Sequence, residues 1–153
     1  MEILIILILI LLNGVLSMSE IALVSARKTN LEPKAKKGDR SAQTVLKLAE
    51  EPDKFLSTIQ IGITLIGILT GLYSGETFAG SLAVYLSHIS ALEPYALAVS
   101  KTLIVVIVTY LTLILGELVP KRIGMGCPER VALLIARPMY LLSLIASPFV
   151  WLL

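Results

Sequence analysis

The sequence predicts an all-α membrane protein with three transmembrane helices, amphipathic juxtamembrane helices and a proline-broken C-terminal helical hairpin. Three observations predict this class. Of the 153 residues 56% are hydrophobic, and the mean hydropathy is +0.88, well above that of ordinary soluble domains. Apolar runs long enough to cross a bilayer recur along the chain. Eight of the thirteen Lys and Arg residues lie between residues 27 and 54, in one connecting segment.

The composition also excludes several classes of function. The net charge of +2 is too small to indicate a nucleic-acid partner. Cys127 is the single cysteine, so no disulfide forms within the chain. His88 is the single histidine, which argues against Ser-His-Asp catalysis and against a His-rich zinc site. We therefore expect no enzymatic activity.

The first span is expected over residues 2–25. Glu2 and the absence of a basic start argue against a signal peptide. Asn13, Ser17 and Glu20 follow at i, i+4 and i+7 and share one face of the helix. Buried Asn and Ser side chains can simply hydrogen-bond between helices. Glu20 either binds a cation or lies at the interface near Arg27.

The basic segment is expected to form juxtamembrane helices over about residues 29–51. Ala42, Val45 and Ala49 recur at helical spacing, which predicts an amphipathic helix on the membrane surface. Asp39 or Ser41 is suited to cap its start. Because cytoplasmic loops are enriched in Lys and Arg, this segment is expected inside and the amino terminus outside.

The second span is expected over about residues 55–74. Gln60, Thr64, Gly67 and Gly71 share one face, and Gly67-xxx-Gly71-xxx-Gly75 is a repeated small-residue pattern. This face predicts either a groove for helix packing or oxygen ligands that face the polar stripe of the first span. Residues 75–100 lack Lys and Arg and are expected to form an external loop.

The third span is expected over about residues 101–120, with its end placed in the cytoplasm by Lys121 and Arg122. It contains Glu117 near that end. Pro120 has no N–H, so the carbonyl of Gly116, four residues back, loses its helical hydrogen bond. A carboxylate beside a freed carbonyl offers the oxygen ligands that a hard cation prefers.

Residues 128–153 are nearly all apolar, but Pro138 and Pro148 interrupt the run. We interpret the segment as interfacial or re-entrant helices that keep the carboxyl terminus in the cytoplasm; a fourth span is the alternative. Because the chain ends within apolar sequence, we expect a cytoplasmic portion to follow in the full-length protein.

Three stretches in this order resemble the transmembrane domain of the CorC/CNNM family, also called DUF21. They are Asn13-Gly14-Val15-Leu16-Ser17-Met18-Ser19-Glu20, Ile59-Gln60-Ile61-Gly62-Ile63-Thr64-Leu65 and Gly116-Glu117-Leu118-Val119-Pro120-Lys121. The resemblance implies a homodimer in the cell (inner) membrane, with three spans and a belt of juxtamembrane helices in each subunit. It also implies a cytoplasmic CBS-pair module and a small C-terminal domain in the full-length chain.

The resemblance further implies Mg²⁺ export, coupled to Na⁺ entry. It places the cation site at Ser17, Ser19, Glu20, Gly116 and Glu117, beside the distortion at Pro120. Many relatives carry Asn in the second helix, where this chain has Ile63 and Gly67, so Gln60 or Thr64 would have to substitute, and Asn13 is a further possible ligand. The alternative function is a non-transporting cation sensor or scaffold that regulates partner transporters.

Overall fold

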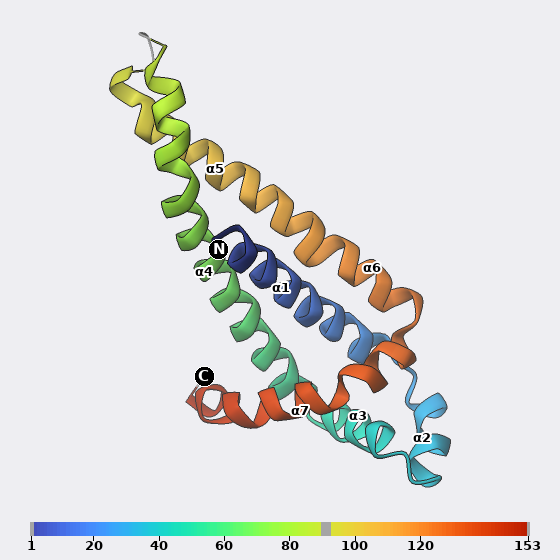
Figure 1. The fold of residues 1–153 in the computed structure, drawn as a ribbon. Helices are drawn as coiled ribbons and strands as arrows, with labels where there is room; N and C mark the ends of the chain where they lie inside the picture. The colour runs from blue at the N-terminus through green and yellow to red at the C-terminus, as the bar shows by residue number, and fades with distance from the viewer. Residues whose placement is uncertain (1, 90–92, 153) are drawn as a thin grey trace.

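The structure is a computed structural model that describes residues 2–89 and 93–152. These residues form helices and short connections, which confirms the all-α prediction (Figure 1). In order the elements are α1 (Glu2–Ser25), α2 (Lys28–Lys36), α3 (Arg40–Glu50), α4 (Pro52–Ser87), the 3₁₀ turn η1 (Glu93–Tyr95), α5 (Ala96–Leu113), the π-helical turn η2 (Ile114–Leu118), α6 (Val119–Gly126) and α7 (Pro128–Leu152).

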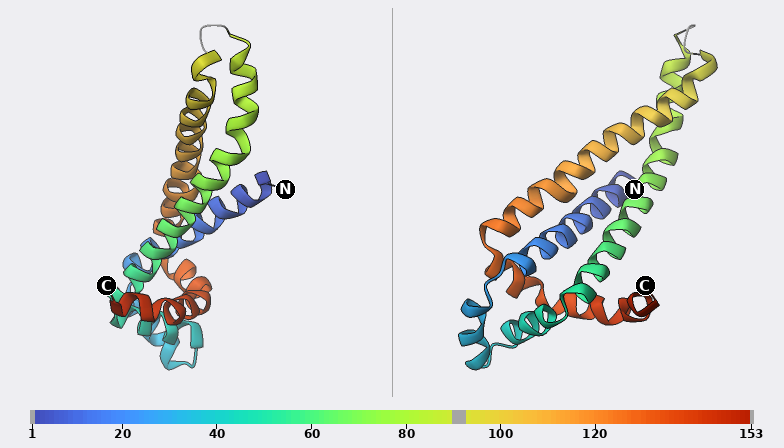
Figure 2. Two further views of the ribbon diagram at one scale, coloured as in Figure 1. Left: turned by 90° about the vertical axis from the view of Figure 1, so that its left-hand side faces the viewer. Right: turned by 180° about the vertical axis from the view of Figure 1, so that it is seen from behind.

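The helices form a long bundle with a layer of short helices at one end. α1, α4 and the continuous α5–η2–α6 rod are the long members, and α1 packs against both of the others (Figures 1 and 2). α2, α3 and α7 gather at the end where α1 finishes and α4 begins. The basic segment and the carboxyl end of α6 therefore share one end of the molecule.

The outer surface of the bundle is apolar, as a membrane protein requires. Four helical segments, Glu2–Ser25, Pro52–Ser87, Glu93–Gly126 and Pro128–Leu152, are long and apolar enough to cross a membrane. On α5, Val105, Val106 and Tyr110 are at least half exposed. A surface of large apolar side chains on this scale is stable in lipid and not in water.

The loop expected at residues 75–100 is mostly helical, because α4 continues to Ser87 and α5 already begins at Ala96. Residues 90–92 of this range lie outside the described residues, and the external location stays a prediction. Gly75 and Gly80 each destabilise a helix by only about 1 kcal/mol relative to alanine. Packing offsets this cost, since Ser74 and Ala79 on α4 are buried where it runs beside Ala96 and Ser100 on α5. With 36 residues, α4 is about 54 Å long, and its hairpin with α5 extends past the start of α1 (Figure 1).

The third long rod also continues beyond its expected end at residue 120, through Pro120 to Gly126. A π-helical turn at Ile114–Leu118 makes this possible, because the N–H of Val119 bonds to the carbonyl of Ile114, five residues back. The extra residue in the turn changes the backbone hydrogen-bonding pattern just before Pro120. The missing N–H of the proline therefore distorts the helix locally but does not end it.

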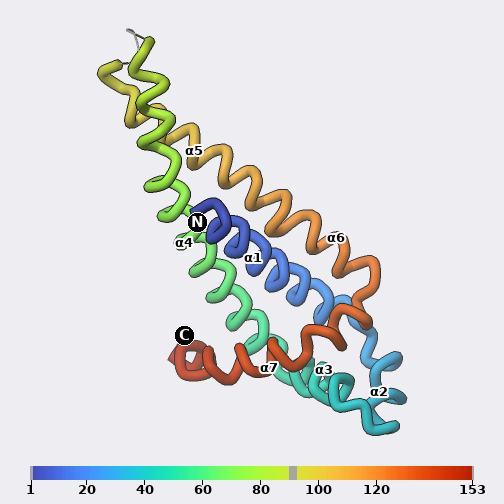
Figure 3. The backbone as a smooth tube through the Cα atoms, viewed as in Figure 1, coloured from blue at the N-terminus to red at the C-terminus, as the bar shows by residue number. Residues whose placement is uncertain are grey.

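The proline-broken hairpin predicted for residues 128–153 is wrong as well, because α7 is one helix from Pro128 to Leu152. Pro138 and Pro148 remove the bonds to the carbonyls of Leu134 and Leu144, whose side chains are 79% and 50% exposed. The defects lie at the outer surface of the helix, so it bends without breaking. Although long enough to span, α7 lies across the ends of α1 and α4 (Figures 1 and 3).

The hydrophobic core lies where the layer of short helices meets the bundle. Its best-buried side chains come from five elements: Ala22 on α1, Leu31 on α2, Val45 on α3, Phe55 and Ile59 on α4, and Ala132 and Ala136 on α7. Asp39 caps α3 by accepting hydrogen bonds from the N–H groups of Ser41 and Ala42. This core holds the carboxyl-terminal half of α1 in place against its neighbours.

Glycine at position 124 allows α6 to pack directly on α1. A Cβ at Gly124 would lie 2.6 Å from Cγ2 of Ile21 and 2.8 Å from the backbone oxygen of Met18. The side chain of Ile21 can adjust, but the helical backbone of α1 cannot move without disturbing the bundle. Contact between α1 and α6 therefore depends on glycine, which has no side chain, at position 124.

We expect Gly124→Ala to lower the free energy of unfolding by about 1–3 kcal/mol, because the added methyl overpacks the α1–α6 contact. Thermal unfolding of purified protein in detergent measures the loss. Gly126→Ala is the matched control on the same helix, since a Cβ there meets nothing within 4 Å. Equal stability of the two variants would contradict the packing argument.

Candidate cation site

The π-helical turn and α1 are joined by a buried hydrogen bond. The side-chain amide of Asn13 donates from Nδ2 to the carbonyl oxygen of Gly116, at 3.1 Å. Pro120, four residues after Gly116, has no N–H to offer this carbonyl. The side chain of Asn13 on α1 supplies a hydrogen-bond donor to it.

Small residues bring the two segments close enough for this bond. A Cβ at Gly14 would lie 3.0 Å from Cγ of Pro120 and 3.3 Å from the carbonyl oxygen of Leu115. A Cβ at Gly116 would lie 3.1 Å from Nδ2 of Asn13 and 3.3 Å from the carbonyl oxygen of Ile10. Glycine on both sides therefore lets the helices approach backbone to backbone.

Buried oxygen atoms without partners lie on the same helices. Among the described residues, Oδ1 of Asn13, Oγ of Ser17 and Oγ1 of Thr112 are enclosed and have no hydrogen-bond partner. The same is true of Oγ of Ser100, near the start of α5. Asn13 and Ser17 are 4% and 0% exposed. Asn13 and Ser17 follow at i and i+4 on α1, and the Thr112 side chain lies beside Gly116. Unsatisfied buried oxygens are costly, so such a group suits a bound polar ligand.

Two carboxylates meet one ammonium group nearer the end of α1. Nζ of Lys121 lies 2.9 Å from Oε1 of Glu117 and 3.4 Å from Oε2 of Glu20. The three side chains come from α1, η2 and α6 and are 30%, 38% and 31% exposed, in the order Glu20, Glu117 and Lys121. Glu20 and Glu117 are therefore neighbours across the helix interface, as a shared site requires.

The structure brings Asn13 against Gly116, and Glu20 close to Glu117 through the ammonium of Lys121. Ser17 is buried on the same face of α1 without a hydrogen-bond partner. Ser19 is buried on α1, but its hydroxyl donates to the carbonyl of Val15 on its own helix. Gln60 and Thr64 are exposed on α4 and line a shallow surface hollow with Ile61, Leu65 and Ile68. Within one subunit these two residues of α4 do not join the others, so their assignment as ligands finds no support.

Chemically the site has two layers along one interface. Neutral oxygens of Asn13 and Ser17 lie toward the middle of the bundle, and the carboxylates of Glu20 and Glu117 lie nearer the layer of short helices. In the part of the chain that the structure describes, no three His, Cys, Asp or Glu side chains group together as a metal cluster. The donors are hard oxygens, which suit Mg²⁺ or Na⁺ and not a thiophilic metal.

Lys121 and Thr112 were not predicted as members of the site. In the sequence Lys121 indicates only the orientation of the third span. The signal for its role is that it follows Glu117 at i+4, where opposite charges pair on a helix. This spacing brings the charges together only because the helix continues through Pro120. Thr112 lies one turn before Gly116 at the same spacing.

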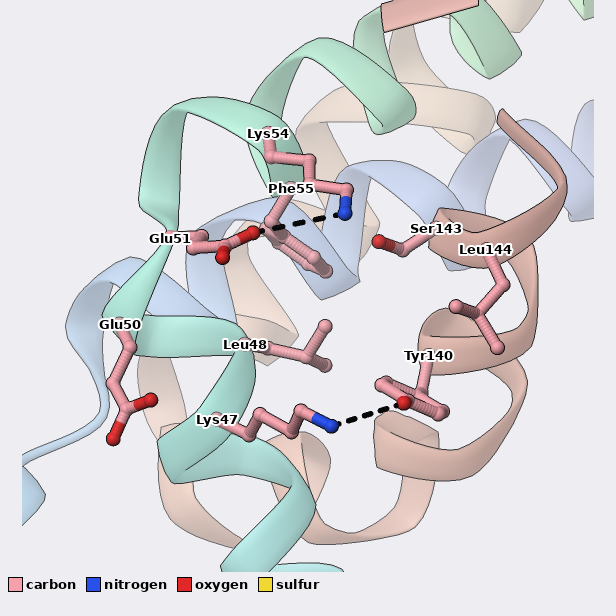
Figure 4. A pocket seen from close by; sticks show the side chains of 9 residues that line it. All are labelled: Lys47, Leu48, Glu50, Glu51, Lys54, Phe55, Tyr140, Ser143 and Leu144. Atoms are coloured by element: carbon pink, nitrogen blue, oxygen red, sulfur yellow. Dashed lines mark hydrogen bonds and ion pairs between the residues drawn. The ribbon is translucent and has the colours of Figure 1, made fainter. Parts of the chain in front are cut away.

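A separate polar cavity of about 250 Å³ lies among α3, the start of α4 and α7 (Figure 4). Lys47 donates to the Tyr140 hydroxyl at 3.1 Å and lies over its ring, and Lys54 pairs with Glu51 at 3.7 Å. The hydrogen bond to Tyr140 raises the pKa of Lys47 above its ordinary value. The Lys47–Tyr140 pair ties α3 to α7, whereas the Lys54–Glu51 pair is local to the start of α4.

Comparison with known proteins gives a consistent match over the whole chain. Residues 4–153 match the family model described as the cyclin M transmembrane N-terminal domain. A UPF0053 protein of Synechocystis sp. is 52% identical over 100% of this chain and 34% of its own length. Polyamine export proteins of Escherichia coli K12 and Haemophilus influenzae are 37% and 35% identical, over 98% and 94% of this chain and 33% of their own. The chain thus spans about a third of the length of these relatives.

We expect Asn13→Leu to lower the free energy of unfolding by about 1–3 kcal/mol, because it leaves the Gly116 carbonyl buried without a donor. Hydrogen exchange at the amides of the η2 turn should accelerate at the same time. Gln60→Leu is the control, since that side chain is exposed on α4. If Asn13→Leu is as stable as the control, the bond does not hold the turn.

Proposed function

The chain belongs to the cyclin M transmembrane domain family, and from this premise we propose that it is the membrane part of a cation exporter whose substrate is Mg²⁺. The observation that carries the proposal is the meeting of Glu20 and Glu117, from separate helices, on the face of α1 that also holds the buried, unpartnered oxygens of Asn13 and Ser17. Charged groups at membrane depth are rare and mark ion pathways.

The available ligands are of the type that Mg²⁺ prefers, and their number approaches the number that Mg²⁺ needs. Mg²⁺ needs about six oxygens in octahedral geometry and commonly keeps several waters. Glu20 and Glu117 supply carboxylates, and Asn13 and Ser17 supply oxygens that make no other bond. The Gly116 carbonyl is free to join only when Asn13 releases it, which links ion binding to the π-helical turn.

Export requires an energy source. Moving a divalent cation outward against 100 mV costs about 2.3 kcal/mol per charge, hence about 4.6 kcal/mol. A passive pore would carry Mg²⁺ inward, so we propose that inward Na⁺ movement supplies the energy. Na⁺ would use the same hard oxygen ligands.

The arrangement of the helices supports an orientation for this exporter. The carboxylates lie at the end of the bundle that also holds the basic α2 and α3, which we place in the cytoplasm with the amino terminus outside. Cations would then reach the carboxylates first and the neutral oxygens next. We further propose a homodimer in the cell membrane, with a cytoplasmic CBS-pair module in the full-length chain.

We expect Glu117→Gln to abolish Na⁺-dependent Mg²⁺ efflux from proteoliposomes containing the full-length protein, because the variant loses one of the two carboxylates. Glu76→Gln is the matched control, an exposed carboxylate on the projecting part of α4. Normal efflux by Glu117→Gln would contradict the site. Mg²⁺ binding without flux in the unmodified protein would indicate a sensor and not an exporter.

A second candidate substrate is a polyamine. One observation favours it: the carboxylate pair already binds a primary ammonium group, that of Lys121. A diamine carries the same group at each end, and two of the relatives are named polyamine export proteins. Such a substrate would bind Glu20 and Glu117 through hydrogen bonds from nitrogen and would need no octahedral set of ligands.

We expect a polyamine substrate to compete with Mg²⁺ at this one site. Spermidine uptake into inverted vesicles, measured with and without Mg²⁺, distinguishes the two substrates. Spermidine uptake that Mg²⁺ inhibits and that is lost in Glu117→Gln would favour the polyamine, whereas Mg²⁺ efflux unaffected by spermidine would exclude it.

A further inference from the structure

We propose that Lys121 is a built-in competitor for the transported cation: its ammonium pairs with Glu20 and Glu117 and must be displaced before a cation can bind them. This inference rests on the proposed cation export, because it concerns the same carboxylates. It assigns a role to a residue that the ligand set does not include, and it names the charge that the substrate must carry.

The contacts are those of a bound cation. Nζ of Lys121 is 2.9 Å from Oε1 of Glu117 and 3.4 Å from Oε2 of Glu20, so one ammonium bridges two helices. Both carboxylates are about two-thirds enclosed. A metal ion or a substrate ammonium that bridges the same oxygens would occupy the position of Nζ, and the two cannot be there together.

The charges explain why a competitor is useful. Two partly buried carboxylates without a counter-ion repel each other and are costly near the membrane. With Lys121 in place the group of three has a net charge of −1, and without it the remaining pair has −2. A divalent cation or a diamine neutralises that pair, whereas a single K⁺ only replaces one positive charge with another. Lys121 therefore disfavours singly charged cations.

The Lys121 side chain can also move toward water when it leaves the carboxylates. Its side chain is 31% exposed, and α6 ends at Gly126, close to the layer of short helices. A long flexible stem lets an ammonium swing from a buried partner toward water. The neighbouring Arg122 is already exposed at this end. Displacement thus moves Lys121 outward without a change in the backbone.

We expect Lys121→Gln to lower the half-saturating Mg²⁺ concentration for efflux by about tenfold, which corresponds to about 1.4 kcal/mol. K⁺ should also inhibit this variant more strongly than the unmodified protein. Lys121→Arg should raise the half-saturating concentration, because a guanidinium binds carboxylates in a bidentate fashion. These opposite shifts are not expected of a lysine that only stabilises the fold.

The assay uses the full-length protein in proteoliposomes, with Mg²⁺ as the probe and spermidine in a parallel arm. Arg122→Gln is the matched control, since it removes the same charge one residue away. If efflux occurs and depends on Glu117, but Lys121→Gln and Arg122→Gln saturate alike, the competitor role is wrong and the exporter stands. If the unmodified protein moves neither cation, the exporter itself is wrong. Should Lys121→Gln fail to fold, an unchanged half-saturating concentration in Lys121→Arg overturns the competitor role by itself.

Discussion

The close approach of α1 to the π-helical turn is the constraint on which the rest of the structure depends. Gly14, Gly116 and Gly124 remove the side chains that would keep the helices apart, and Asn13 then bonds to the Gly116 carbonyl, to which Pro120 has no N–H to offer. The bond compensates a backbone defect inside a membrane, where water cannot do so. The defect persists because the neighbouring helix satisfies it.

The same approach creates the polar site. Helices separated by large apolar side chains would hold Glu20 and Glu117 apart, each with its own counter-ion. Packed through glycine, they bring both carboxylates to one ammonium and enclose Asn13 and Ser17 oxygens that have no other partner. Packing and electrostatics are therefore coupled here, because a change in the spacing of α1 and α6 alters the distance between the charges. A cation that binds between them would act on the π-helical turn through Gly116.

The layer of α2, α3 and α7 fixes the base of this arrangement. Its buried apolar residues hold the end of α1 and the start of α4, while the outer faces of α5 and α7 remain apolar. The upper part of α4 and α5 lacks such support and packs only as a hairpin. The glycines Gly67, Gly71 and Gly75 on α4 meet nothing within 4 Å inside one subunit, so the small-residue pattern there is not used by its own chain.

The sequence by itself determined the membrane class, the first span, the polar stripe of Asn13, Ser17 and Glu20, and a helix distortion before Pro120. Each follows from local chemistry: apolar length, helical spacing and the missing N–H of proline. Tertiary structure alone decided that α4 continues through polar residues, that Pro138 and Pro148 bend α7 without breaking it, and that Lys121 joins Glu20 and Glu117. These outcomes depend on contacts between segments distant in the chain, since packing offsets the cost of glycine and proline and only the folded helices bring charges from positions 20 and 121 together.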